Sequence, residues 1–159
     1  MRHVNKFIAA TLGAMALAGC GGSSGTSSSA NAQSSAQFVS QVNRICSDVN
    51  AKVGALPAIQ TQADLLRTGP KELSMSSAAL AELKALTPPA SKQAAVTQYI
   101  SGIDQESAIS TQVLAAVKAG DSAQTKALSD KGSALNSTDD ARAKALGFAQ
   151  CARNVQPAG

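Results

Sequence analysis

Apolar residues from position 36 onward recur at spacings of three and four along the chain. This period is that of one face of an amphipathic helix. Four such stripes follow one another: Phe38, Val42, Ile45, Val49 and Val53; then Leu65, Leu66, Leu73, Leu80 and Leu83; then Val96, Ile100, Ile103, Ser107, Ser110, Leu114 and Val117; and finally Leu128, Leu135, Ala141, Leu146 and Phe148. The pattern therefore predicts four amphipathic helices.

Residues that end helices lie where the stripes stop. Gly54 and Pro57 follow the first stripe, Pro88-Pro89 follows the second, and Gly120 follows the third. Glycine adopts the left-handed conformation of a C-terminal cap and proline cannot continue a helix, so these positions indicate helix ends. Two pairs predict the N-terminal caps of helices that follow: Thr61 with Asp64, and Asp121 with Gln124.

Two segments predict interruptions within helices. Gly69-Pro70 lies inside the second stripe. Because proline lacks a backbone donor and clashes with the preceding turn, we expect it to divide that helix into a short and a long piece. Residues 136–138 (Asn-Ser-Thr) lie inside the fourth stripe, where Ser137 and Asp140 are expected to cap a new helical segment.

Four amphipathic helices with short connections predict an all-α fold. We expect an antiparallel four-helix bundle of up-down-up-down topology over residues 36–155. Alanine, the strongest helix former, is about one residue in five, whereas aromatic residues are 3% and Trp is absent. Many stripe positions are Ala or Ser, so the core holds few large side chains and a covalent staple is expected.

A charged and then apolar segment precedes the bundle. Residues 1–6 (MRHVNK) carry two positive charges, and the 12 residues 7–18 (FIAATLGAMALA) are apolar. A helix needs about 20 apolar residues to span a bilayer, so this run is too short. The pattern is typical of a secretory signal peptide, here residues 1–19. The alternative is an N-terminal helix of the folded domain.

Leu17-Ala18-Gly19-Cys20 lies directly at the end of the apolar run. These residues resemble the lipobox of bacterial lipoproteins. The resemblance implies diacylglyceryl transfer to the Cys20 sulfur, cleavage before Cys20, and a lipid anchor on the extracytoplasmic face of the cell membrane. A competing small-x-small cleavage site, Ala30-Asn31-Ala32, lies 12 residues beyond the apolar run. A free or structural Cys20 is a further alternative.

Residues 20–35 join the lipobox to the bundle. After Cys20 they are rich in Gly and Ser and hold no large apolar side chain. Such a segment cannot bury enough apolar surface to offset the entropy of ordering it. We therefore expect a disordered tether, with a root-mean-square reach of roughly 20 Å.

With Cys20 assigned to lipid, Cys46 and Cys151 remain as a pair in an exported chain, where disulfides persist. Cys46 lies in the middle of the first predicted helix and Cys151 near the end of the last. The first and last helices of an up-down-up-down bundle are antiparallel neighbours, so we expect a Cys46–Cys151 disulfide. The alternative is two buried thiols acting as small apolar residues.

Several short motifs follow one another in the predicted bundle: Phe38-Val39, Asn43-Arg44-Ile45-Cys46, Leu83-x-x-Leu86-Thr87-Pro88-Pro89, Ala119-Gly120-Asp121, and Ala145-Leu146-Gly147-Phe148-x-x-Cys151-Ala152. In this order they resemble a group of small, largely uncharacterised lipoproteins of high-GC Gram-positive bacteria. The resemblance implies the helical bundle and the cysteine pair. It implies no catalytic residue.

Charge and residue types limit the chemistry. Of 14 Lys and Arg, Arg2 and Lys6 precede Cys20, which leaves 12 against 10 Asp and Glu, and no block of like charges indicates nucleic-acid binding. The single histidine, His3, lies in the predicted signal peptide, so histidine-dependent nucleophiles are excluded from the mature chain. No serine lies three residues before a lysine, and no zinc ligand set is present. We expect no enzyme, cofactor or metal.

Two further features have a structural and a functional interpretation. Asp139-Asp140 is expected to form a solvated helix start, where the helix dipole favours negative charge, with cation binding as the alternative. Tyr99 is expected to pack at the edge of the core with its hydroxyl in water, with ligand binding as the alternative.

The sequence thus predicts a lipid-anchored, extracytoplasmic helical bundle that acts by binding, with the membrane and an envelope protein as partners. The alternative function is a carrier or sensor that holds a small apolar ligand in the bundle interior, because a core lean in large side chains leaves room for voids. No residue pattern identifies the ligand or the oligomeric state.

Overall fold

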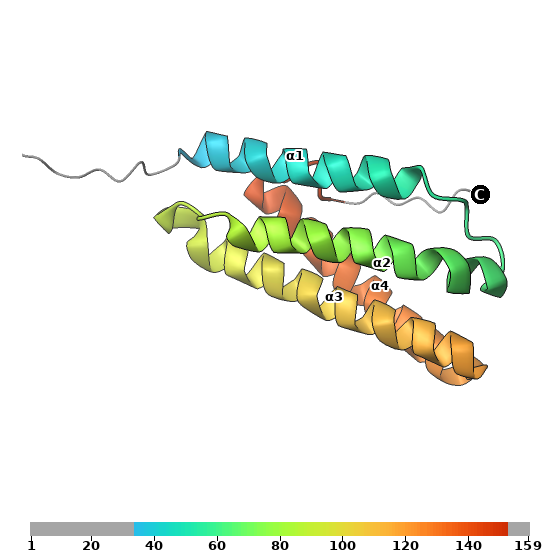
Figure 1. The fold of residues 1–159 in the computed structure, drawn as a ribbon. Coiled ribbons are helices and arrows are strands. Elements are labelled where there is room, and N and C mark those ends of the chain that lie inside the picture. Colours follow the sequence, from blue (N-terminus) through green and yellow to red (C-terminus); the bar gives the residue numbers. More distant parts are fainter. Residues whose placement is uncertain (1–33, 153–159) are drawn as a thin grey trace, which may run out of the picture. The chain divides into compact units, whose positions relative to one another are not determined.

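The computed structural model describes residues 34–152 and shows an antiparallel four-helix bundle (Figure 1). Its elements are α1 (Ser35–Gly54), α2 (Gln62–Ala85), the 3-10 turn η1 (Ala90–Lys92), α3 (Gln93–Ala119) and α4 (Ser122–Leu146). Along the bundle α1 packs on α2, α2 on α3 and α3 on α4. Every described element lies in one compact unit of the chain. The predicted signal peptide and Cys20 lie outside the described residues.

Side-chain caps start three of the helices. Thr61 Oγ1 accepts from the Asp64 backbone N–H at 3.1 Å, and the Asp121 carboxylate accepts from that of Gln124 at 2.9 Å, as predicted. A third cap was not predicted. Ser34 Oγ accepts from the Gln37 N–H, and the Gln37 side chain accepts from the Ser34 N–H, which completes a capping box. The bundle therefore begins at Ser35, inside the stretch expected to be tether.

The predicted break at Gly69-Pro70 is wrong, because α2 continues through Pro70. Proline leaves the Leu66 carbonyl without its usual helical donor. Tertiary packing keeps the segments before and after Pro70 in one helix. Gly69 is buried against α3, and a Cβ at this position would lie 2.8 Å from Leu114 Cδ2.

The predicted interruption at residues 136–138 is also wrong, because α4 runs unbroken from Ser122 to Leu146. Ser137 Oγ donates to the Ser133 carbonyl and Thr138 Oγ1 to the Ala134 carbonyl, both at 3.1 Å. These hydroxyls therefore bond back to the preceding turn instead of capping a new segment.

The buried face of α4 also differs from the predicted stripe. Ala141 is exposed, whereas Ala143 is completely buried.

The core lies at the end of the bundle where α1 begins. Phe38 and Phe148, each 1% exposed, are its largest fully buried side chains. The Phe148 ring lies 6.0 Å from that of Phe38 and 5.5 Å from that of Tyr99, between centroids. Tyr99 is 4% exposed, so the expectation that it lies at the edge of the core is wrong. The segment after α4 folds over Tyr99 and covers it. The core cluster comprises Phe38, Val42, Ile45, Cys46, Leu83, Val96, Tyr99, Ala143, Leu146 and Phe148.

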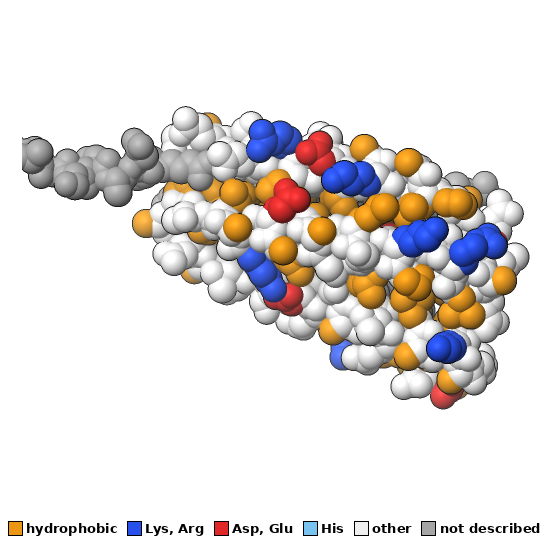
Figure 2. All heavy atoms as spheres, viewed as in Figure 1, with side chains coloured by type: hydrophobic (Ala, Val, Ile, Leu, Met, Phe, Trp, Pro, Cys, Tyr) orange, Lys and Arg blue, Asp and Glu red, His pale blue; other side chains and the backbone are white. Residues whose placement is uncertain are grey.

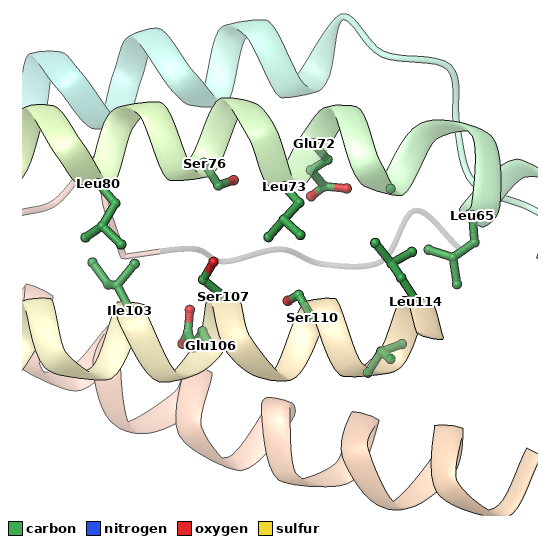
Figure 3. A pocket seen from close by; sticks show the side chains of 12 residues that line it. Leu65, Glu72, Leu73, Ser76, Leu80, Ile103, Glu106, Ser107, Ser110 and Leu114 are labelled. Atoms are coloured by element: carbon green, nitrogen blue, oxygen red, sulfur yellow. The ribbon is translucent and has the colours of Figure 1, made fainter. Parts of the chain in front are cut away.

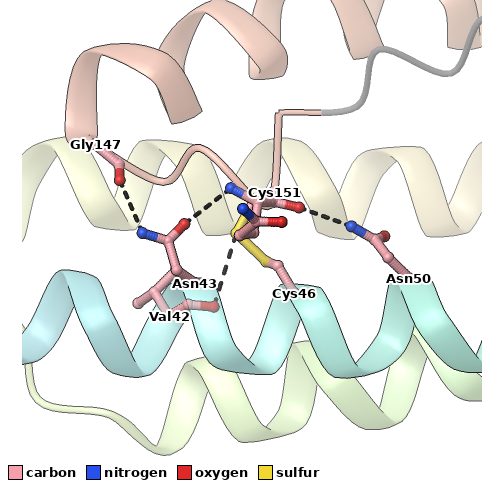
Figure 4. Close-up of a disulfide and its surroundings, with 7 residues drawn as sticks. Val42, Asn43, Cys46, Asn50, Gly147 and Cys151 are labelled. Carbon is pink, nitrogen blue, oxygen red and sulfur yellow. Dashed lines mark hydrogen bonds between the residues drawn. A yellow bond between two sulfur atoms is a disulfide. The ribbon is translucent and has the colours of Figure 1, made fainter. Parts of the chain in front are cut away.

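Cys46 and Cys151 form the predicted disulfide, with their Cα atoms 5.0 Å apart (Figure 4). Two asparagines of α1 hold the segment that carries Cys151. The Asn43 side chain donates to the Gly147 carbonyl at 3.0 Å and accepts from the Gln150 N–H at 2.9 Å. The Asn50 side chain donates to the Gln150 carbonyl at 2.7 Å. The chain after α4 is thus fixed to the middle of α1 by a covalent bond and three hydrogen bonds.

Candidate ligand-binding cavity

Away from the core cluster, the interior of the bundle is incompletely filled. The leucines of the other end are only half-buried: Leu65, Leu73, Leu114, Leu128 and Leu135. Between α2 and α3 lies a cavity of about 220 Å³, which we call the α2–α3 cavity (Figure 3). Figure 2 shows apolar side chains gathered along the groove between these two helices.

Apolar side chains form most of the wall of the α2–α3 cavity. Leu65, Leu73 and Leu80 line it from α2, and Ile103, Val113 and Leu114 line it from α3. The polar groups are hydroxyls and carboxylates: Ser76 and Glu72 from α2, and Glu106, Ser107 and Ser110 from α3. A mostly apolar cavity with a few converging polar groups is the usual form of a small-molecule site.

Small residues at inward positions explain why the space exists. Ser107 and Ser110 occupy stripe positions of α3 where larger residues would fill the interior, and both side chains extend into the space between α2 and α3 (Figure 3). Gly69, on the facing helix, also lines the cavity. Serines within an otherwise apolar stripe are the sequence feature from which the cavity could have been found.

Asp139 is buried, which contradicts the expected solvated helix start. It lies in the interior of α4 and is 3% exposed. Arg142 Nη1 donates to its Oδ1 at 2.6 Å. The other oxygen, Oδ2, lies against Gly102 of α3 and has no hydrogen-bond partner. Burial is possible because α3 presents a glycine where any Cβ would collide with the carboxylate.

The other site residues predicted from the sequence lie in different parts of the chain. Cys46 and Cys151 are bonded to each other, while Cys20 lies outside the described residues. Asp140 is half-buried next to Asp139. Over residues 34–152, no group of three or more His, Cys, Asp or Glu side chains could hold a metal ion.

Comparisons with known proteins give no relative for this chain. No protein-family model matches it, and neither the curated proteins nor the solved structures contain a match. Among the described helices, none has the length and apolar character required to cross a membrane.

Proposed function

We propose that the chain is a lipid-anchored protein of the extracytoplasmic membrane face whose helical bundle binds a small, mainly apolar ligand in the α2–α3 cavity. The cavity is the observation that carries the binding part of this proposal. The lipobox-like residues 17–20 carry the anchor. In this arrangement Cys20 holds the membrane, the segment after it acts as a tether, and the bundle presents the cavity to the space outside the cell.

The size of the cavity supports a small ligand. A cavity of about 150 Å³ lined by apolar side chains accepts benzene. By proportion, a volume of about 220 Å³ holds a molecule of about nine non-hydrogen atoms. The carboxylates and hydroxyls would orient such a molecule, while the leucines supply apolar contact area.

Binding is favoured over catalysis by the side chains available. Serine hydroxyls line the cavity, but a serine nucleophile needs an adjacent general base. Histidine is the usual base, and His3, the one histidine in the sequence, lies in the segment we expect to be removed. We therefore propose a carrier or sensor, not a hydrolase.

A large docking surface for an envelope protein has less support. In the described part of the chain, the exposed large hydrophobic side chains are Ile59 at 41% and Leu66 at 37%. Protein interfaces usually have a buried core of several aromatic and aliphatic residues. These two side chains alone do not form one, so we place the binding function in the cavity.

The anchor is tested by Cys20→Ala. Without the thiol no thioether to diacylglycerol can form, so we expect the protein to leave the membrane fraction or to remain as an unprocessed precursor. Fractionation and intact mass measurement separate these results from the wild type. Unchanged membrane association of a processed Cys20→Ala chain would contradict lipidation at this residue.

The cavity is tested by native mass spectrometry of the wild-type chain purified from its host. We expect a co-purifying small molecule. Ser107→Leu should remove it, because the larger side chain fills the cavity. Ser101→Leu, the same substitution at an exposed position of α3, is the matched control and should retain it. A wild-type chain without any bound molecule would overturn the proposed ligand binding.

A further inference from the structure

The α2–α3 cavity is long and narrow. Leu65 and Leu80, which line it from α2, lie 15 residues apart, or about 22 Å along the helix axis. Ile103 and Leu114, which line it from α3, lie 11 residues apart, or about 16 Å. Spread over this length, a volume of about 220 Å³ leaves a mean width of about 4 Å. Two carbon atoms in contact lie about that far apart, so the cavity is about one carbon wide.

The two ends of the cavity are apolar, and its polar groups gather between them (Figure 3). Leu65 and Leu114 lie at one end, and Leu80 and Ile103 lie at the other. The polar side chains of the middle are three hydroxyls and two carboxylates: Ser76, Ser107, Ser110, Glu72 and Glu106. A ligand that lies lengthwise in the cavity therefore meets leucines along most of its body and hydroxyls at one level.

The three serine hydroxyls of the cavity make no hydrogen bond within residues 34–152. Other hydroxyls of these helices bond back to the preceding turn: Thr111 Oγ1 donates to the Ser107 carbonyl at 3.0 Å, and Ser137 Oγ to the Ser133 carbonyl at 3.1 Å. A serine hydroxyl has one donor and can also accept. The hydroxyls of the cavity are therefore available to a ligand, and an oxygen of the ligand can accept from them.

The charges at the cavity do not require an ionic ligand. Glu72 and Glu106 line it, and no Lys or Arg is found among its described lining residues, so an anionic group would have no counter-charge there. Glu106 already has an interaction partner within the protein. Glu72 is only half-buried, so water can solvate its charge. An uncharged oxygen that accepts from a serine hydroxyl fits this arrangement.

We infer that the ligand of the α2–α3 cavity is an unbranched aliphatic chain with a carbonyl group, bound lengthwise between the two helices with its oxygen at Ser76 and Ser107. This inference rests on the proposed ligand binding and specifies the ligand's class. A width of about one carbon admits a single chain of methylenes. A ring is at least two carbons wide, so it would have to force α2 and α3 apart, which a packed interior resists.

Two ketones with the same number of carbons test the shape of the ligand: 2-octanone, which is an unbranched chain, and cyclooctanone, which is a ring. Their affinities are compared after correction for their different partition between water and octanol. The protein is the mature-length chain, residues 20–159, with Cys20→Ser to prevent lipidation, and it contains every described helix and the disulfide. Calorimetry measures affinity, and methyl chemical shifts of Leu73 and Leu114 report whether the probe occupies the cavity.

We expect 2-octanone to bind about tenfold more tightly than cyclooctanone, because widening a packed interior costs about this factor. Ser107→Ala should weaken the binding of 2-octanone about fivefold, the usual contribution of a hydrogen bond between neutral groups. Ser101→Ala, the same change at an exposed position of α3, is the matched control and should have no effect. Helical circular dichroism verifies the fold, and Ser76→Ala serves as a second variant if Ser107→Ala does not fold.

The outcomes separate the two proposals. Equal or tighter binding of cyclooctanone overturns the unbranched chain and leaves ligand binding in place. Binding of 2-octanone that neither Ser107→Ala nor Ser76→Ala weakens overturns the contact of its oxygen with the serines. Failure of both ketones, in a protein that co-purifies with a molecule of another class, overturns the ligand class alone. Failure of both ketones together with an empty native protein overturns both proposals.

Discussion

The contact between Asp139 and Gly102 shows how one missing Cβ permits a buried charge. The carboxylate of α4 occupies the position that a side chain at residue 102 would take on α3. Arg142, one turn later on α4, bonds to the other carboxylate oxygen and lies partly in solvent. The buried aspartate is therefore accommodated by Gly102 of α3 and by Arg142 of its own helix, α4.

We expect Gly102→Ala to destabilise the bundle by about 1–3 kcal/mol, because the new methyl group collides with the Asp139 carboxylate and forces one helix to move. Gly132→Ala is the matched control. There a Cβ would lie 3.4 Å from Ile109 Cγ2, an ordinary contact. The higher helix propensity of alanine should then stabilise the fold by up to about 1 kcal/mol. Chemical denaturation measures both, and equal effects would contradict the collision.

Thr61 and Asp64 form the cap of α2, and their contact affects the titration of the carboxyl group. The hydrogen bond from the Thr61 side chain, with those from the Gln60 and Thr61 N–H groups and the charge of Arg67, holds the pKa of Asp64 below its ordinary value of 3.8. The cap thus contributes stability above pH 3.8 and loses it as the pH falls through the lowered pKa.

Thr61→Ala should raise the pKa of Asp64 toward 3.8, because the largest cause of the depression is removed. Carbon-13 NMR titration of the carboxyl group measures the change. Arg67→Ala should move this pKa less, since the attraction of Arg67 is the smallest of the causes. A larger effect of Arg67→Ala than of Thr61→Ala would reverse this ranking.

At the scale of elements, the ends of α3 and α4 are closed in the same way. Gly120 and Gly147 follow these helices with φ of 72° and 84°, the left-handed conformation that glycine adopts without strain. Each end also receives a donor from a neighbouring element: Gln62 Nε2 bonds to the Val117 carbonyl at 2.8 Å, and Lys92 Nζ to the Leu146 carbonyl at 3.3 Å. The Val117 carbonyl also accepts from the Gly120 N–H at 3.1 Å, so the Gln62 side chain is its second donor, whereas the Leu146 carbonyl lies in the last turn, where helical donors are missing.

Gly120→Ala should destabilise the bundle by about 1 kcal/mol, the cost of placing an L side chain in the left-handed region. The cost is purely conformational, because nothing lies within 4 Å of a Cβ at this position. Gly120→Asn should cost less, since asparagine tolerates this region better. Thermal unfolding checks the order, and an alanine variant as stable as the wild type would be inconsistent with it.

Local rules predicted the helices well and their interruptions badly. The Thr61 and Asp121 caps depend on neighbouring residues alone, and the structure confirms them. The stripes predicted the four helices, but the buried face of α4 differs from its stripe. The continuity of α2 through Pro70 depends on packing against α3, which the sequence of α2 does not contain. The same limit applies to the site. The position of Ser107 in the apolar stripe of α3 predicts that its side chain faces the interior. Whether a facing helix fills the space there depends on Gly69 of α2 and on how the helices diverge.

At the scale of the bundle, packing is uneven. The aromatic and branched side chains gather around Phe38 and Phe148. The disulfide lies at the border between this core and a hollow of about 70 Å³, which Cys46 and Cys151 help to line. Apolar burial is the main stabilising contribution in folding. A bundle that buries few large side chains and keeps a hollow therefore depends more than usual on its covalent bond.

Removing the disulfide with Cys46→Ser and Cys151→Ser together should lower the free energy of unfolding by up to about 5 kcal/mol, the chain-entropy value for a loop of about 105 residues. The loss of stability should be greatest in the segment that the disulfide attaches to α1, so we expect amide exchange to accelerate first over residues 147–152. Asn50→Ala, which removes one hydrogen bond to the same segment, should cost only about 1 kcal/mol.

If the double variant loses no more than Asn50→Ala, the hydrogen bonds and Phe148 hold the segment without the disulfide, and the bond is dispensable for the fold. If it loses several kcal/mol, native mass spectrometry below the unfolding transition shows whether the α2–α3 cavity still retains its co-purifying molecule when α1 is no longer bonded to the segment after α4.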